Sequence, residues 1–191
     1  MKKILLSFGV FASLSVSAQL DTLANHFTGT PTIYTSIAGG YIAGNNSYGD
    51  KAKMQLFDAT YGVSGAGIIK SVLLSIPIKN NGGGSFKVKL WAKNPDGTLG
   101  AELGSTTITV ASVDTSLLGY NVGSDFFYNV NATFNVPVPA NNAFWAGVEL
   151  PTGVNDTIVL NSTTNGDFTA AITHTFETWS DGSFHSFWRA N

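Results

Sequence analysis

Cysteine is absent from this chain of 191 residues, and charged residues make up only 12% of it. Without thiols the chain can form no disulfide and offers no cysteine nucleophile, so a folded domain has to be stabilised by its apolar core. Basic residues form no run longer than the pair Lys2-Lys3. Because nucleic acid is bound mainly through clustered Lys and Arg, we expect no nucleic-acid partner.

Motifs of common enzyme classes are also missing, since there is neither a G-x-S-x-G nucleophile elbow nor an H-E-x-x-H zinc motif. The three histidines are His26, His174 and His185. The hairpin expected below places the last two about 13 Å apart at a rise of roughly 3.3 Å per residue. That is too far for two imidazoles to share one ion at bond lengths of about 2 Å. We therefore predict a non-enzymatic protein with no catalytic residue, no metal site and no cofactor.

Two alternatives stay open from the residues. Glu149 lies near Trp145 on one expected strand and Glu177 near Trp179 on another, and a glycoside hydrolase needs two such carboxylates. The segments AGNNSYGD and NSTTNGD are rich in Asn and Asp, whose oxygens suit a structural calcium ion. Asn and Asp beside glycine usually stabilise turns, so turn formation is the simpler account of both segments.

The N-terminus has the three parts of a secretory signal peptide: Lys2-Lys3, an apolar run that starts at Ile4, and small residues before Gln19. We expect cleavage after Ala18, so that residues 1–18 are the signal peptide and 19–191 the mature chain. The apolar run is shorter than the about 20 residues that span a bilayer. The mature chain has 8 basic and 12 acidic residues, a net charge of −4, and no further long apolar run. We predict a secreted protein without a membrane span.

Alternating apolar residues predict strands in the first half of the mature chain. Val72, Leu74, Ile76 and Ile78 share one face of such a strand, and Phe86, Val88 and Leu90 continue the period after the turn sequence NNGGG. Pairing Ile78 with Phe86 in a hairpin would bring both apolar rows to one side. Trp91 would then lie on the opposite side of its strand.

The same alternation recurs in residues 128–138 and 144–150, where Trp145 and Glu149 point away from the apolar row. Shorter candidate strands are 32–36, 104–110 and 157–161, whereas 50–59 is expected to hold one helical turn at most. Many short strands separated by turns are typical of an antiparallel β-sandwich. We therefore predict an all-β, jelly-roll-like sandwich that forms a single domain.

A final hairpin is predicted around Asp181-Gly182, a preferred centre of a two-residue type I′ turn. That register pairs Trp179 with Phe184 and Thr175 with Trp188, which gathers three aromatic rings on one face. Flat rings beside polar groups can bind a polysaccharide, whereas buried rings would belong to the core. The candidate ligand-binding residues are Trp91, Trp145, Trp179, Phe184 and Trp188.

Four segments, GGYIAGNNSYGDKAKMQLF, VKLWAKNPDGTLGAELGS, FWAGVEL and ETWSDGSFHSF, together resemble a β-sandwich module of secreted Bacteroidota proteins. The resemblance covers most of the mature chain. Such proteins often end in a type IX secretion sorting domain, which these residues do not include. The resemblance implies that the domain continues beyond Asn191 and that the chain is exported.

From these observations we expect a non-catalytic module that is an accessory or structural part of an extracellular or cell-surface protein. If no outer-membrane export signal exists, the periplasm is the expected location. Its partners would be polysaccharide or other domains of a larger secreted protein. A carbohydrate-binding module is the alternative, and a glycoside hydrolase is a remote one.

Overall fold

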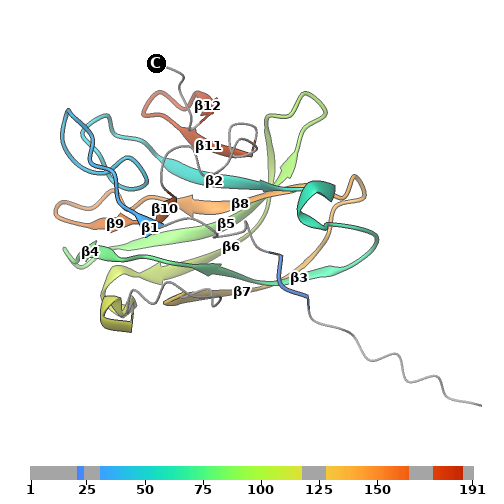
Figure 1. The fold of residues 1–191 in the computed structure, drawn as a ribbon, viewed down its shortest axis with the longest axis horizontal. Coiled ribbons are helices and arrows are strands. Elements are labelled where there is room, and N and C mark those ends of the chain that lie inside the picture. Colours follow the sequence, from blue (N-terminus) through green and yellow to red (C-terminus); the bar gives the residue numbers. More distant parts are fainter. Residues whose placement is uncertain (1–20, 24–30, 118–127, 164–173, 187–191) are drawn as a thin grey trace, which may run out of the picture.

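The computed structural model describes residues 21–23, 31–117, 128–163 and 174–186, and these residues form antiparallel sheets (Figure 1). This confirms the all-β class. The described part of the chain contains no α-helix, only the 3-10 turns η1 (Ala59–Tyr61), η2 (Val110–Ser112) and η3 (Thr115–Leu117). No helix in these ranges is long and apolar enough to cross a membrane. The predicted signal peptide, 1–18, lies outside the described residues.

The largest element is a six-stranded sheet whose strands appear from top to bottom of Figure 1 in the order β12-β11-β2-β8-β5-β6. Every neighbouring pair in it is antiparallel. Its strands, in chain order, are β2 (Ala52–Phe57), β5 (Ser85–Lys93), β6 (Leu99–Thr109), β8 (Phe144–Glu149), β11 (Thr175–Thr178) and β12 (Phe184–Ser186).

Three two-stranded sheets complete the fold: β1 (Pro31–Thr32) with β10 (Ser162–Thr163), β3 (Ile68–Leu74) with β7 (Val130–Pro137), and β4 (Ile78–Asn80) with β9 (Thr157–Val159). Side-chain amides bridge the break between β3 and β4, where Pro77 lacks an N–H. The Asn129 side chain accepts from the Ile76 N–H and donates to the Ile76 carbonyl, each at 2.8 Å. An asparagine thus replaces the missing ladder bonds.

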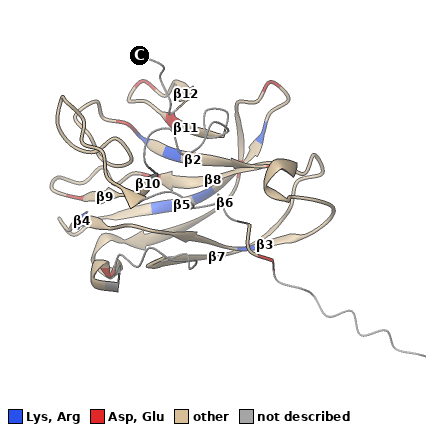
Figure 2. Ribbon diagram, viewed as in Figure 1, with Lys and Arg blue, Asp and Glu red and all other residues tan. Residues whose placement is uncertain are grey.

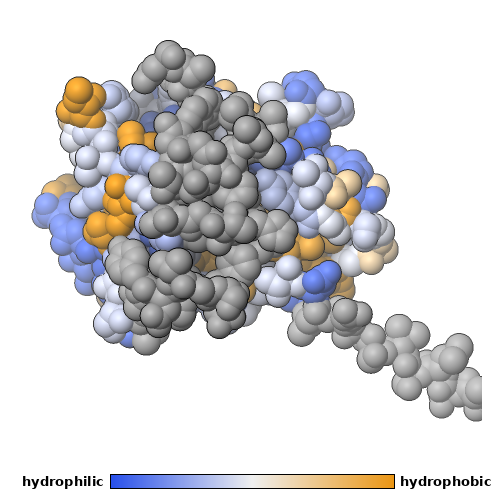
Figure 3. Space-filling view, viewed as in Figure 1, coloured by the Kyte–Doolittle hydropathy of each residue, from blue (hydrophilic) through white to orange (hydrophobic). Residues whose placement is uncertain are grey.

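The main core lies between the six-stranded sheet and the small sheets. Phe86, Val88 and Val148 from the large sheet form one buried cluster with Val130 of β7 and Ile158 of β9. Phe86, Val88 and Leu90 are buried at alternate positions of β5, which confirms the alternation expected in 86–90. In 144–150 it is confirmed by the core clusters, because Trp145 belongs to a different cluster from Phe144, Ala146, Val148 and Leu150. Burial of such aliphatic and aromatic side chains is the main favourable contribution to folding in a chain without disulfides. On the face drawn in Figure 3, the hydrophobic residues of the described chain appear in separate patches between hydrophilic ones.

The predicted hairpin of 72–78 with 86–90 is wrong. β3 pairs with β7, β4 pairs with β9, and β5 pairs with β6 and β8. The two apolar rows do face one core, but they reach it from different sheets. Alternation reports which face of a strand is buried and does not report which strand lies beside it.

The glycine-rich turn between β4 and β5 is fixed by a buried carboxylate. Asp156 is 6% exposed, and its Oδ1 accepts from the N–H of Gly82 at 2.7 Å and of Gly84 at 3.2 Å. A Cβ at Gly84 or Gly153 would overlap the same carboxylate group. Glycine is therefore required at those two positions to leave room for the Asp156 side chain.

Residues 50–59 were expected to hold a helical turn at most, and this expectation missed a central strand. β2 lies between β8 and β11, and Ala52, Met54 and Leu56 on one side of it are buried. Lys53 on the other side is buried as well. Lys51, Lys53 and Gln55 alternate with these apolar residues, a pattern that normally marks one exposed face of a strand, so the burial of Lys53 is not evident from the sequence.

Candidate functional site

The hairpin of β11 and β12 differs by one residue from the register predicted for it. Thr178 pairs with Phe184 and Glu177 with His185. The Gly182 N–H donates to the Trp179 carbonyl, and Gly182 has a φ of 86°, whereas Asp181 has no positive φ. A type I′ turn would need positive φ at both central residues, so the loop is a three-residue turn closed by a left-handed glycine.

This shift places the hairpin side chains on different faces from those predicted. Directly paired residues share a face of a sheet, so Phe176 and Phe184 lie on one face of the six-stranded sheet. Glu177, Trp179 and His185 lie on the other face, which also carries the main core. We call the face with Phe176 and Phe184 the aromatic face. We call the opposite face, in the region of the hairpin, the polar face. The predicted pairing of Trp179 with Phe184 is therefore wrong.

The aromatic face holds a packed group of rings. The Phe176 and Phe184 rings stack with centroids 4.6 Å apart, and both meet the edge of Trp145 at 5.1 and 5.3 Å. Trp91 lies directly across from Trp145 on β5 and belongs to the same cluster. Both tryptophans point away from the main apolar row, as the strand period predicts.

Burial limits what these rings can bind. Trp145 is 1% exposed and Trp91 is 7% exposed, so neither presents a ring face to solvent in this structure. The Trp145 Nε1 atom is buried and has no hydrogen-bond partner among the described residues. Phe184 is half-buried. Trp188, the fifth candidate residue, lies outside the described residues.

The polar face is organised around one buried cation. The Lys53 Nζ atom lies 2.6 Å from a carboxylate oxygen of Asp50 and 2.6 Å from one of Glu177. All three side chains are buried, with exposed fractions of 4%, 5% and 14%. Figure 2 shows the blue segment of β2 beside the red segment of β11, the two strands that carry the second pair. The two carboxylates neutralise the lysine inside the protein, so none of the three charges is left uncompensated.

Trp179 and His185 extend this cluster toward the turn. The Trp179 Nε1–H donates to Glu177 at 2.7 Å, and the rings of Trp179 and His185 stack with centroids 3.5 Å apart. Ser183 Oγ lies 2.7 Å from His185 Nε2 and also bonds to Asp181. A catalytic triad needs the histidine between serine and acid, but here the serine is in the middle. The hydrogen bonds from the Ser183 side chain and backbone lower the pKa of Asp181, as expected for a turn carboxylate.

The two carboxylates considered for glycoside hydrolysis lie on opposite faces of the sheet. Glu149 pairs with Ala52 on the aromatic face, whereas Glu177 pairs with Lys53 on the polar face. Glu149 forms an ion pair with Lys89, which also contacts Glu102 at 3.0 Å. Burial alone would lower the pKa of Lys89, but the hydrogen bonds to both carboxylates raise it above its usual value. Because a sheet separates Glu149 from Glu177, they cannot flank one glycosidic bond.

Within the described ranges, no group of three or more His, Asp or Glu side chains converges to hold a metal ion. His174 Nε2 lies 3.3 Å from Asp58 and its ring meets the edge of Tyr61. In the loop 43–50, the Asn45 side chain bonds the backbone of Pro151 and Ile158. The other candidate calcium segment, 161–167, lies mostly outside the described residues.

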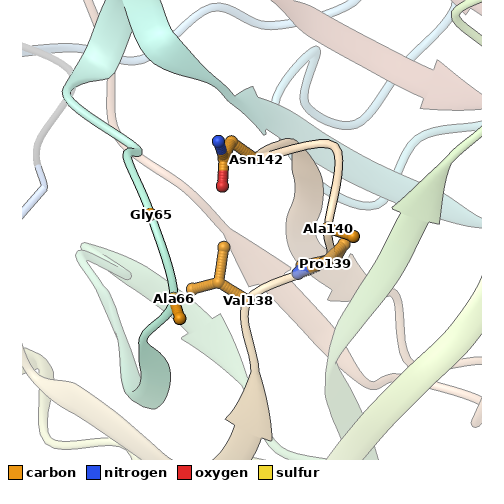
Figure 4. Close-up of a pocket in the computed structure, with 6 residues that line it drawn as sticks. All are labelled: Gly65, Ala66, Val138, Pro139, Ala140 and Asn142. Carbon is orange, nitrogen blue, oxygen red and sulfur yellow. The ribbon is translucent and has the colours of Figure 1, made fainter.

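One hollow of about 400 Å³ opens between the segment after η1 and the turn after β7. Gly65, Ala66 and Val138 line it together with Pro139, Ala140 and Asn142, and Figure 4 shows Asn142 and Val138 on opposite sides of the opening. None of these residues carries an acid, a base or a nucleophile. The hollow therefore lacks the groups for acid–base or nucleophilic catalysis.

Comparison with known proteins adds no assignment, since no family model, curated protein or solved structure matches the chain.

Sequence reasoning missed the role of Asp50 and Lys53. Asp50 follows Gly49, a context that predicts a turn residue, and Lys53 falls in the segment 50–59, for which one helical turn at most is expected. The available signal was the apolar alternation of Ala52, Met54 and Leu56 around the lysine. A lysine inside a strand with one fully apolar side indicates either an exposed face or a buried ion pair, and only the position of β11 decides between them.

Proposed function

We propose that the protein is a secreted, non-catalytic module that serves as an accessory or structural part of an extracellular or cell-surface protein. In this proposal the six-stranded sheet and the smaller sheets are the two layers of a jelly-roll-like β-sandwich. The main core, which contains residues of β5 and β8 as well as β7 and β9, supports that arrangement. The likeness to secreted Bacteroidota modules and the predicted signal peptide support export.

The observation that carries the proposal is the internal pairing of the polar face. Lys53 binds two carboxylates, Glu177 also accepts from Trp179, and Asp50 also accepts from Asn46 at 2.7 Å. Catalytic acids and bases have to reach a substrate in an accessible cleft. Here the charged groups that a catalyst would use bind one another in the protein interior instead.

Two measurements on the full chain test this proposal. Mass spectrometry of exported protein should show a mature chain that begins at Gln19, and one still carrying Met1 would contradict export. The mature chain should release no reducing ends from a panel of soluble polysaccharides. Hydrolysis that survives further purification and is lost in Glu177→Gln would overturn the non-catalytic assignment.

Trp179 favours carbohydrate binding as a second candidate function. Its indole is held by the hydrogen bond to Glu177 and the stack on His185, and it stays only half-buried. A ring that is partly exposed and held in one orientation suits a sugar face. Retention of the mature chain on a glycan array, lost in Trp179→Ala and kept in Tyr48→Ala, would support this function. Tyr48 is an exposed aromatic residue outside the hairpin and serves as the matched control.

A further inference from the structure

The strand β6 covers eleven residues at one edge of the six-stranded sheet. Among the residues that the structure describes, β6 pairs with β5 along one side only, and it is the lowest strand of that sheet in Figure 1. A long strand that is paired on one side exposes backbone groups that can pair with another chain.

The ladder between β5 and β6 shows which backbone groups point outward. The Val110 N–H donates to the Gly84 carbonyl at 3.0 Å, in the register that pairs Ser85 with Thr109. Bonded and non-bonded pairs alternate in an antiparallel ladder. The N–H and C=O groups of Thr109, and by the same alternation of Thr107 and Ser105, therefore point away from β5.

The half of β6 from Gly104 to Thr109 lacks the features that usually prevent an edge strand from pairing with another chain. Between Gly104 and Thr109 there is no charged residue and no proline, and both register shifts of the pair lie in the other half of the strand. β7 approaches from the core side, where Thr106 Oγ1 donates to the Thr133 carbonyl at 2.8 Å. That contact uses a side chain, and within the described residues β7 pairs with β3 alone.

We propose that β6 is a pairing site for a second copy of this chain, with the two β6 strands antiparallel about a two-fold axis at Thr107. Thr107 would pair with its own counterpart, and Ser105 with Thr109 of the second copy. The outward N–H and C=O groups of all three residues would then find partners, two bonds in each pair. This goes beyond the proposed function, because a module can be non-catalytic without associating.

A second copy fits this edge for reasons of charge and side-chain type. The segment is uncharged, so self-pairing places no like charges directly opposite each other, and cross-strand Thr–Thr and Thr–Ser pairs are favourable in sheets. Lys87 lies beside Thr107 on β5, and the two copies of Lys87 would be three strand spacings apart, about 14 Å. That exceeds the screening length of roughly 8 Å at physiological salt. One added strand pair buries less than the about 1,200 Å² of a stable interface, so association should be weak.

The absence of cysteine permits a direct test of the axis. In Thr107→Cys the two new thiols would lie on paired residues with Cα atoms about 5.5 Å apart, within the range that a disulfide spans. Oxidised glutathione should convert this variant to covalent dimer several-fold faster than Thr152→Cys. Thr152 is an exposed threonine in the loop after β8 and is the matched control. Equal rates for the two variants would overturn the proposed axis.

Sedimentation equilibrium on the mature chain is the second measurement. The mean mass should rise with concentration for the unmodified chain and for Thr152→Lys, and should stay at the monomer value for Thr107→Lys. A lysine at the centre of the edge faces its own copy across the axis, which opposes pairing. A strict monomer at every concentration would overturn the proposal. So would an association that Thr107→Lys leaves unchanged, because the contact would then lie on another surface.

Discussion

The two faces of the sheet at the β11–β12 hairpin bury large side chains by different means. On the aromatic face, Trp145, Phe176 and Phe184 pack ring against ring. On the polar face, the side chains of Lys53 and Glu177 are 4% and 14% exposed, and each neutralises the charge of the other. An apolar cluster loses stability in proportion to the volume removed, whereas a buried ion group loses it whenever one member is left unpaired. The comparison predicts that conservative substitutions are tolerated on the aromatic face and are not tolerated on the polar face.

The largest loss is expected from Lys53→Met, which keeps the length of the side chain and removes its charge. Asp50 and Glu177 would then be buried without their cation, and breaking a buried pair in this way costs about 3–5 kcal/mol. Urea denaturation would measure the loss. Lys87→Met, at an exposed position of β5, is the control and should stay within about 0.5 kcal/mol. Equal effects of the two substitutions would show that the ion group does not contribute as described.

A loss of similar size is expected from Trp145→Ala on the aromatic face, about 3–5 kcal/mol for a large buried aromatic side chain. Trp145→Phe should cost much less, because it keeps one ring in the cluster and removes an indole N–H that has no hydrogen-bond partner in the described part of the chain. Thermal unfolding of both variants would compare them. If Trp145→Phe were as damaging as Trp145→Ala, the difference between the two faces would not hold.

Trp179→Phe should have an intermediate effect. The change keeps an aromatic ring beside His185 but removes the donor to Glu177, and hydrogen bonds to charged groups contribute about 1.5–3 kcal/mol. A double-mutant cycle of Trp179→Phe with Glu177→Ala would isolate this interaction by urea denaturation, because alanine removes the acceptor that glutamine would keep. Additive effects in the cycle would contradict coupling between the two side chains.

Gly182→Ala should cost about 1–2 kcal/mol, the penalty for placing a side chain in the left-handed region. Its φ is 86°, and a Cβ there would meet no atom within 4 Å, so backbone strain is the whole effect. The neighbouring Ser180→Ala is the matched control and should change stability by less than about 0.5 kcal/mol. Circular dichroism during thermal unfolding would measure both, and indistinguishable midpoints would exclude the left-handed turn.

The smallest effect is a pH dependence at the turn. The pKa of Asp181 is lowered by the side chain and the backbone N–H of Ser183, so the ionised form is favoured in the folded state. Its contribution to stability is present above the pKa of the unfolded chain and is lost as the pH falls through the lowered folded value. An NMR titration of the Asp181 carboxyl should give a midpoint below the about 3.9 of a free aspartate. The same titration in Ser183→Ala should return the midpoint toward that value.

Most of the strands, and the faces of β5, β7 and β8, could be predicted from the sequence, because alternation follows directly from the pleat, but the central strand β2 was missed. Strand order could not be predicted, since NNGGG resembles a simple hairpin turn and Asp156, which accepts from the N–H groups of Gly82 and Gly84, lies far along the chain. The predicted register of the β11–β12 hairpin was wrong for a local reason. Asp-Gly suits both a type I′ turn and a three-residue loop, and these differ by one position.

The site was predicted less well than the fold. Trp91 and Trp145 were predicted from alternation to lie away from the main apolar row, and both are covered in the aromatic face. Trp179, Phe184 and Trp188 were grouped by the predicted hairpin register, which is wrong for Trp179 and Phe184. A second apolar cluster behind a sheet cannot be distinguished from an exposed platform by period alone. The buried ion group required knowledge that β11 lies beside β2, a contact between segments more than a hundred residues apart.

The Asp156 carboxylate has a consequence for how the glycine-rich turn behaves over time. A run such as NNGGG has the composition of a flexible linker. Two of its amide protons, those of Gly82 and Gly84, are nevertheless donated to one nearly inaccessible oxygen. In deuterated solvent they should exchange as slowly as protons in the neighbouring strands, since they are released only when that part of the domain opens. The most glycine-rich stretch of the chain would thus report on the opening of its ordered interior.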